Sequence, residues 1–270
     1  KDMQGFLLDN GYQLRRTIGE GMYFKVKEVF SQKHQQKVAI KIVDKKKSPE
    51  AFVQKFLPRE LQIATRLDHR NIIHVHEVLE APEGKICLVM ELAENGDVFD
   101  YMLRKGLLPK SRARALFLQL VEAVRYCHSC GVAHRDLKCE NVLLQGHTVK
   151  LTDFGFSKLL PRDSRELSWT FCSSTAYTAP EVLHGEPHDS YKGDIWSLGV
   201  ILYILLCAHL PFDDTNITRM LHQQQKGIST PAHLGVSREC LNLLNSLLEP
   251  DPALRPPIEE VSRHPWLSSP

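Results

Sequence analysis

The spacing of hydrophobic residues changes once along this 270-residue chain, near Glu91. Before that point β-branched and aromatic residues fall in four short runs separated by glycine or polar turns, which predicts a sheet. A helical pattern over residues 49–67 interrupts them, with Ser48 and Pro49 suited to its cap and first turn. Helical spacings then dominate, over residues 97–104, 110–130, 193–206, 217–225, 238–248 and 258–263. We therefore expect an α+β fold with a β-rich lobe carrying one main helix and a mainly helical lobe.

The two lobes are expected to meet at a cleft. We treat residues 1–10 as an N-terminal extension and residues 11–267 as the folded domain. Within that domain the first lobe spans residues 11–90, a hinge spans 91–95 and the second lobe spans 96–267. A long irregular segment follows the second expected helix and runs to about residue 183. Loops of that length in a compact domain are usually functional.

The composition, 43% hydrophobic and 24% charged, is that of a globular protein rather than a disordered one. A net charge of +2 gives no reason to expect nucleic-acid or membrane partners. The longest apolar run, residues 198–207, is shorter than the roughly twenty residues that cross a bilayer. We expect a soluble, cytoplasmic protein.

Seven cysteines at irregular spacings favour reduced thiols over a disulfide framework. Cys127 and Cys130 form a C-x-x-C pair, but no second pair follows that would complete a zinc site. We interpret the pair as packing at a helix end, and a metal site is the less favoured alternative.

The stretch IGEGMYFKV, residues 18–26, has two glycines placed to cradle a phosphate. Backbone N–H groups of Gly19 and Gly21 could coordinate phosphate oxygens, although any hairpin can carry two glycines. The third position of a G-x-G-x-x-G pattern holds Phe24. Its ring could turn outward at the loop, or fold under it and crowd the phosphates. We expect the outward ring, because the first two glycines make the closest backbone approach.

Lys41 follows three apolar strand residues in VAIK. A strand lysine ordinarily faces solvent. A lysine that faces a cleft needs a carboxylate to hold it, and Glu60 in PRELQI is the candidate.

Two polar segments, HRDLKCEN at 134–141 and DFG at 153–155, carry the strongest chemical signal. They supply Asp136, Lys138, Asn141 and Asp153. Carboxylate and amide oxygens suit Mg²⁺, an acid can accept the proton of an attacking hydroxyl, and a lysine can neutralise a moving phosphoryl group. A chance match to both segments in this order is negligible.

With these motifs the chain resembles the eukaryotic protein kinases over essentially its whole length. TAPE at 178–181, DIWSLGV at 194–200 and Arg255, the expected partner of Glu181, match further family features. Lys138 in HRDLK is typical of serine/threonine kinases. FLPRELQI, GKICLVMELA and LPFDDT resemble the testis-specific serine/threonine kinases of the calcium/calmodulin-dependent group. The resemblance implies a bilobal kinase fold, Mg-ATP as cofactor, protein serine or threonine as substrate, and a role in spermatogenesis.

The resemblance also implies residue roles. Lys41 would contact the α- and β-phosphates and pair with Glu60, Asp136 would be the catalytic base, and Lys138 would lie near the γ-phosphate. Asn141 and Asp153 would hold Mg²⁺, and Met90 would stand behind the adenine site. The expected nucleotide contacts are Ile18, Gly19, Glu20, Gly21, Met22, Tyr23, Phe24, Lys25, Val26, Lys41, Glu91 and Ala93.

Asp97 and Glu140 match positions that receive a substrate arginine three residues before the target hydroxyl. Asp97 could instead serve the ribose hydroxyls or cap the next helix. Ser174 is expected to help position the substrate.

Thr170 aligns with the activation-loop phosphosite, with Arg135 as the receiver of its phosphate. The modifying enzyme would be an upstream kinase or the protein itself. Ser168 and Ser173 are weaker phosphosites, and a loop ordered without modification is the alternative. We expect a monomer.

Two other classes of function compete with the kinase assignment. Phe24, and Ser173 where the family usually has glycine, would suit a pseudokinase-like binding module, but Lys41, Asp136 and Asp153 argue against it. A kinase of small molecules is disfavoured by the A-P-E and HRDLK motifs, which belong to kinases that hold a peptide.

Overall fold

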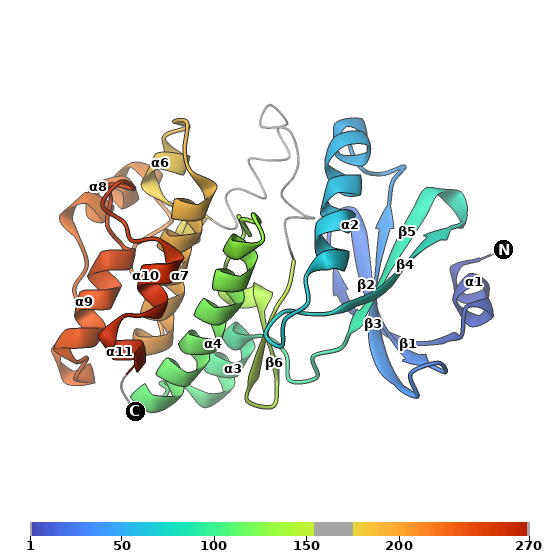
Figure 1. Ribbon diagram of the computed structural model, residues 1–270, viewed down its shortest axis with the longest axis horizontal. Helices are drawn as coiled ribbons and strands as arrows, with labels where there is room; N and C mark the ends of the chain where they lie inside the picture. Colours follow the sequence, from blue (N-terminus) through green and yellow to red (C-terminus); the bar gives the residue numbers. More distant parts are fainter. Residues whose placement is uncertain (1, 154–174, 269–270) are drawn as a thin grey trace.

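A computed structural model describes residues 2–153 and 175–268, which form two lobes (Figure 1). The first lobe is a five-stranded antiparallel sheet in the order β1-β2-β3-β5-β4, with helix α2 lying along it. Its strands are β1 (Tyr12–Glu20), β2 (Phe24–Ser31), β3 (Gln36–Asp44), β4 (Val75–Ala81) and β5 (Lys85–Glu91). A 3-10 turn, η2 (Pro82–Gly84), joins the last two.

Strand β3 has buried side chains on both faces. Val38, Ile40 and Ile42 alternate onto one face and pack with Leu7 of the N-terminal helix. Val43 lies on the opposite face, against the side of the lobe that carries α2. Because successive side chains of a strand point to opposite faces, Lys41 lies on the α2 side.

The chain begins with a helix that the sequence analysis did not predict. Helix α1 (Met3–Asp9) starts at Asp2, whose carboxylate accepts a hydrogen bond of 2.8 Å from the N–H of Gly5. Leu7 is fully buried in the sheet's hydrophobic cluster. Residues 2–10 are therefore packed as part of the first lobe.

The helix expected over residues 49–67 is confirmed, with an irregular first half. A π-helical turn, η1 (Phe52–Phe56), precedes α2 (Leu57–Arg66). The transition falls just before Pro58, which has no N–H and whose ring crowds the carbonyl of the preceding turn.

The second lobe is helical, and the six helices expected there are present with small shifts of their ends. They are α3 (Val98–Lys105), α4 (Lys110–Ser129), α7 (Ser190–Cys207), α8 (Ile217–Lys226), α9 (Arg238–Leu247) and α10 (Ile258–Ser262). Shorter elements are η3 (Cys139–Asn141), η4 (Thr175–Tyr177), α6 (Pro180–Leu183), η5 (Ala232–Leu234) and α11 (Pro265–Ser268). A two-stranded sheet, β6 (Val142–Gln145) and β7 (Thr148–Leu151), lies between the lobes.

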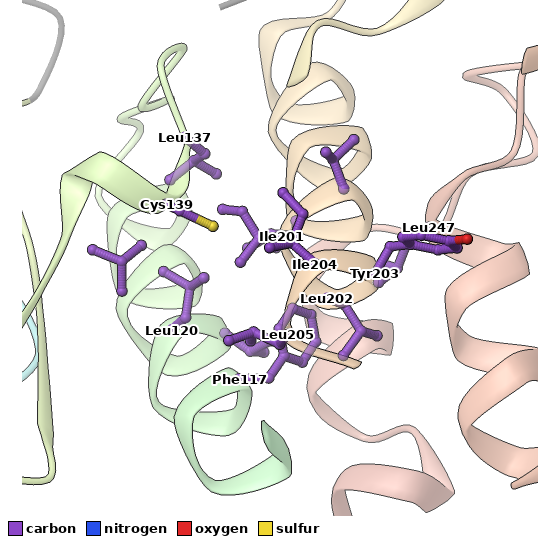
Figure 2. Packing of buried hydrophobic residues seen from close by; sticks show 14 of the residues in the cluster. Phe117, Leu120, Leu137, Cys139, Ile201, Leu202, Tyr203, Ile204, Leu205 and Leu247 are labelled. Carbon is purple, nitrogen blue, oxygen red and sulfur yellow. The ribbon is translucent and has the colours of Figure 1, made fainter. Parts of the chain in front are cut away.

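Helices α4 and α7 form the centre of this lobe (Figure 2). Phe117 and Leu120 of α4 face Ile201 and Leu205 of α7, all nearly free of solvent exposure. Leu137 packs into the same cluster, which fixes the polar loop that follows α4. The loop is therefore held by the lobe's core on one side.

Among the described residues, α7 is the one helix long and apolar enough to cross a bilayer. Within this fold 72% of it is buried, as in the central helix of a hydrophobic core.

Cys127 and Cys130 are free thiols at the end of α4. Cys127 is buried in the core and Cys130 caps the helix. No group of three metal-ligating side chains occurs within residues 2–153 and 175–268. Packing at the helix end is thus confirmed for Cys127, whereas Cys130 is exposed.

Candidate active site

A cavity of about 660 Å³ opens between the lobes, within the size range of small-molecule sites. Ile18, Gly19 and Val26 line it from the first lobe, and Leu143 and Asp153 line it from the second. The first half of the glycine-rich stretch therefore faces the same space as the DFG aspartate.

The hinge side of this cavity is formed by Met90, Glu91 and Ala93. The N–H of Glu91 donates to the carbonyl of His74 at 2.9 Å, and its carboxylate accepts from the N–H of His74 at 2.8 Å. The same carboxylate lies 3.3 Å from the ammonium of Lys150. Glu91 thus joins the two lobes at the point where an adenine would meet backbone groups.

Lys41 reaches the cleft from β3, where it pairs with Val26 of β2. Its side chain is 3% exposed, and its ammonium lies 3.1 Å from the carboxylate of Asp153. Burial alone would raise the pKa of Asp153, but the Lys41 charge outweighs it, helped by His134 and Lys138, so the pKa lies below its usual value. Asp153 is therefore held ionised. The backbone of Glu60 lies in α2, but its side chain lies outside the described part of the structure, so its pairing with Lys41 stays a prediction.

The HRD segment is anchored by Asp194 of α7. One oxygen of this buried carboxylate accepts from the N–H of His134 at 2.8 Å, and the other accepts from the N–H of Arg135 at 2.9 Å. His128 of α4 lies 2.8 Å away on the same carboxylate. These bonds hold Arg135 in a left-handed conformation, with φ of 71°, a strain that persists only where the surroundings fix it.

His134 contacts the segments that carry Asp136 and Asp153 through both ring nitrogens. Nδ1 accepts from the N–H of Asp136 at 3.1 Å, and Nε2 lies 2.7 Å from the carbonyl oxygen of Thr152, so the proton resides on Nε2. The segment before Asp153 is thereby tied to the loop that carries Asp136.

Asn141 closes the same loop. Its side-chain N–H₂ donates to the carbonyl of Asp136 at 2.7 Å, which leaves Oδ1 as its acceptor end. Its carbonyl accepts from the N–H of Thr152 at 3.0 Å. Lys138 places its ammonium 3.9 Å from the Asp136 carboxylate. With Asp153, Asn141 offers the oxygen donors that a hard divalent cation prefers, so the donor set fits Mg²⁺.

Three carboxylates gather where the cavity meets α3. Asp97 caps that helix by accepting from the N–H of Asp100 at 2.8 Å, so the capping alternative is confirmed. Asp97, Asp100 and Glu140 all line the cavity. Burial, and then the charges of Asp100 and Glu140, raise the pKa of Asp97. Asp100 was missed in the sequence analysis, although its place three residues after a capping aspartate puts it on the same end of the helix.

The expectation of an outward Phe24 ring was wrong. The ring centroid lies 4.3 Å from the Lys41 ammonium, and the ring packs against the hydrophobic cluster of the first lobe. A cation over an aromatic face and burial against apolar neighbours both favour this inward position. Met22, at the tip of the loop, is the exposed residue instead.

Other expected residues are placed as follows. Glu181 and Arg255 form a buried bidentate pair, with N···O distances of 2.8 and 3.1 Å, as expected. Thr170, Ser168, Ser173 and Ser174 lie outside the described residues, and their roles stay predictions.

Comparison with known proteins identifies the family. The sequence model of the protein kinase domain family matches residues 12–267. Testis-specific serine/threonine-protein kinase 3 of Homo sapiens and of Mus musculus are each 70% identical over 267 residues, which cover 99% of this chain and 100% of theirs. Testis-specific serine/threonine-protein kinase 1 of Mus musculus is 45% identical over 98% of this chain and 74% of its own.

A crystal structure of Rad53 1-466 in complex with AMP-PNP has a TM-score of 0.80 and 29% identity. The match covers 96% of this chain and 66% of that one. Together with the cleft described above, these matches show that the chain belongs to the protein kinase family, as an ATP-dependent serine/threonine kinase.

Proposed function

We propose that the cleft transfers the γ-phosphate of Mg-ATP to protein serine and threonine hydroxyls, with Asp136 as the catalytic base. The observation that supports this most is the coupling of three polar segments in one place. Lys41 contacts Asp153 at 3.1 Å, while His134 and Asn141 bond Thr152, the residue just before Asp153. A pseudokinase is not favoured, because Lys41, Asp136, Asn141 and Asp153 are all present.

Each residue has a task that its position supports. Lys41 would bind the α- and β-phosphates from the first lobe, while Asn141 and Asp153 would hold Mg²⁺ through their oxygens. The bound Mg²⁺ supplies charge neutralisation on the phosphates. Asp136 would accept the proton of the incoming hydroxyl, and Lys138, 3.9 Å from it, would offset charge on the phosphoryl group.

The test is transfer of label from [γ-³²P]ATP with Mg²⁺ to three peptides that differ in a single acceptor: serine, threonine or tyrosine. We expect label in the serine and threonine peptides and background in the tyrosine peptide. Label in the tyrosine peptide alone, or none in any peptide, would overturn the proposal.

We further propose an arginine-directed preference. Asp97, Asp100 and Glu140 bring three carboxylates to the cavity mouth, and arginine binds carboxylates through two parallel hydrogen bonds. An arginine three residues before the target serine should raise kcat/KM over the alanine peptide. Glu140→Gln should reduce that ratio without changing kcat/KM for the alanine peptide. An equal loss on both peptides would contradict the assignment.

Regulation would act through Thr170. A phosphate there would add charge that Arg135 could receive, since the Arg135 backbone is already fixed by Asp194. Phosphorylation by an upstream kinase or by the protein itself should raise kcat, and Thr170→Ala should not respond. An increase of equal size in Thr170→Ala would exclude this site.

A role in spermatogenesis is proposed from the relatives' names, which describe testis-specific kinases. We propose a cytoplasmic monomer that acts in spermatogenesis. Antibody staining of testis sections and light scattering of the purified protein test the two parts. Signal confined to the nucleus, or a dimer mass at micromolar concentration, would contradict them.

A further inference from the structure

Phe24 occupies an unusual position relative to the two groups that should meet phosphates. A Cβ atom built on Gly21 would lie 2.2 Å from Cε1 and 2.5 Å from Cζ of the Phe24 ring. The ring therefore fills the space directly beside Gly21, and any other residue at position 21 would collide with it. Its other neighbour is the Lys41 ammonium, 4.3 Å from the ring centroid. The ring thus lies next to both the second glycine of the loop and the lysine.

The cleft cavity reaches Lys41 but does not extend to the Phe24 ring. Within the described residues, the 660 Å³ cavity is lined by Gly19, Val26 and Lys41 but by neither Gly21 nor Phe24. Those two residues line a separate hollow of about 310 Å³ with Leu14 and Ile42. The cleft therefore has open space beside Gly19, Val26 and Lys41, whereas the Phe24 ring occupies the space beside Gly21.

The ring is also held in place. It packs against the first-lobe cluster that contains Val43 and Phe52, and Phe24 pairs with Val43 across the β2–β3 ladder. Lys41 has a second contact, to Asp153 at 3.1 Å. A phosphate bound here would compete with the ring for the space beside Gly21 and for the Lys41 ammonium.

We propose that Phe24 is a specificity-determining gate that weakens binding of the nucleotide's phosphates while leaving binding of adenosine unchanged. The inference deepens the proposed function, because it concerns the same nucleotide site. Removing the ring should strengthen phosphate binding by about two- to thirtyfold, the range that corresponds to one cation–π contact. The gain should appear only for ligands that carry β- and γ-phosphates.

The experiment is calorimetric titration of wild type, Phe24→Gly and Phe24→Ser with Mg-AMP-PNP and, separately, with adenosine. Phe30→Ser is the matched control. Phe30 lies on the same strand and face, about 20 Å away along β2, where its ring contacts Arg15. Thermal melts establish that each variant is folded. Two different replacements of Phe24 are used in case one of them does not fold.

We expect both Phe24 variants to bind Mg-AMP-PNP at least about twofold tighter, with adenosine unchanged and Phe30→Ser like wild type. Unchanged Mg-AMP-PNP binding in both variants, or an equal gain for adenosine, would overturn the gate. If the wild type transfers phosphate to peptide and both Phe24 variants bind Mg-AMP-PNP with the wild-type affinity, the gate is wrong and the proposed kinase function stands. If no form binds either ligand, the nucleotide site itself is wrong, and the gate falls with it.

Discussion

Asp194 has no proposed role in the reaction, yet the conformation of the loop that carries Asp136 depends on its side chain. One carboxylate orients the backbone of His134 and Arg135 and binds His128, and His134 then orients Asp136. The sequence motifs predicted which residues gather here. They did not predict the Phe24 ring, because its direction depends on Lys41, on Gly21 and on the cluster beneath, which come from three parts of the chain.

The raised pKa of Asp97 leads to a prediction about pH. An ionised Asp97 would attract the proposed substrate arginine, and protonation would remove that charge. Because burial and the neighbouring carboxylates raise this pKa, the loss should occur at a higher pH than the usual value of 3.8 would give. The arginine-to-alanine peptide ratio of kcat/KM should therefore fall as the pH is lowered from 7.5 towards 4.

The control for this effect is Asp97→Asn, which retains a good helix cap for α3. Its ratio should be smaller than that of wild type and should lose this part of the pH dependence. A wild-type ratio that stays constant over the range, or a variant that follows wild type, would contradict the role of Asp97.

At the scale of elements, the starts of α3 and α9 were predicted to within one residue, whereas α7 begins at Ser190, three residues before its expected start. Asp97, Asp189 and Ser237 each accept a hydrogen bond at the start of the helix that follows. Helix α1 was not predicted, because a seven-residue helix has little periodicity of its own and is stabilised by packing of Leu7 on the sheet.

Two glycines of α7 give a prediction about how helices pack. A Cβ on Gly199 would lie 2.8 Å from Leu248 and 2.9 Å from Cβ of Leu247. Gly199→Ala should therefore lower the free energy of unfolding by about 1–3 kcal/mol through overpacking. At Gly193 the nearest described atom is Val182 Cγ2 at 4.0 Å.

Gly193→Ala is thus the matched control, since it adds the same methyl group to the same helix. It should be neutral or raise stability by up to about 1 kcal/mol, because alanine favours helices over glycine. Urea unfolding measures both variants. A loss of equal size at the two positions would exclude close contact between α7 and α9 as the cause.

At the scale of the whole molecule, the change from strand to helix periodicity near Glu91 predicted two lobes, and the structure has them. The pairing of Glu181 with Arg255 followed from the family resemblance alone, because 74 residues separate the two. Periodicity describes local structure, whereas such a contact depends on how distant segments come together.

That pair supports a prediction about stability. Glu181→Gln would leave the Arg255 charge buried without its partner and should cost about 3–5 kcal/mol in urea unfolding. Glu259→Gln is the control, because the Arg125–Glu259 pair is about half exposed and should contribute less than about 1 kcal/mol. Similar losses of unfolding free energy in both variants would mean that the buried pair stabilises the protein no more than the exposed pair does.

The central claim is that Asp136 performs chemistry in a cleft that binds nucleotide without it. The most direct test compares wild type with Asp136→Asn in two assays, Mg-AMP-PNP binding and label transfer to the serine peptide. We predict that binding stays within about threefold, since the bonds of His134 and Asn141 to the backbone of residue 136 do not depend on its side chain. Transfer should fall at least about a hundredfold. Transfer at the wild-type rate by Asp136→Asn would contradict the account.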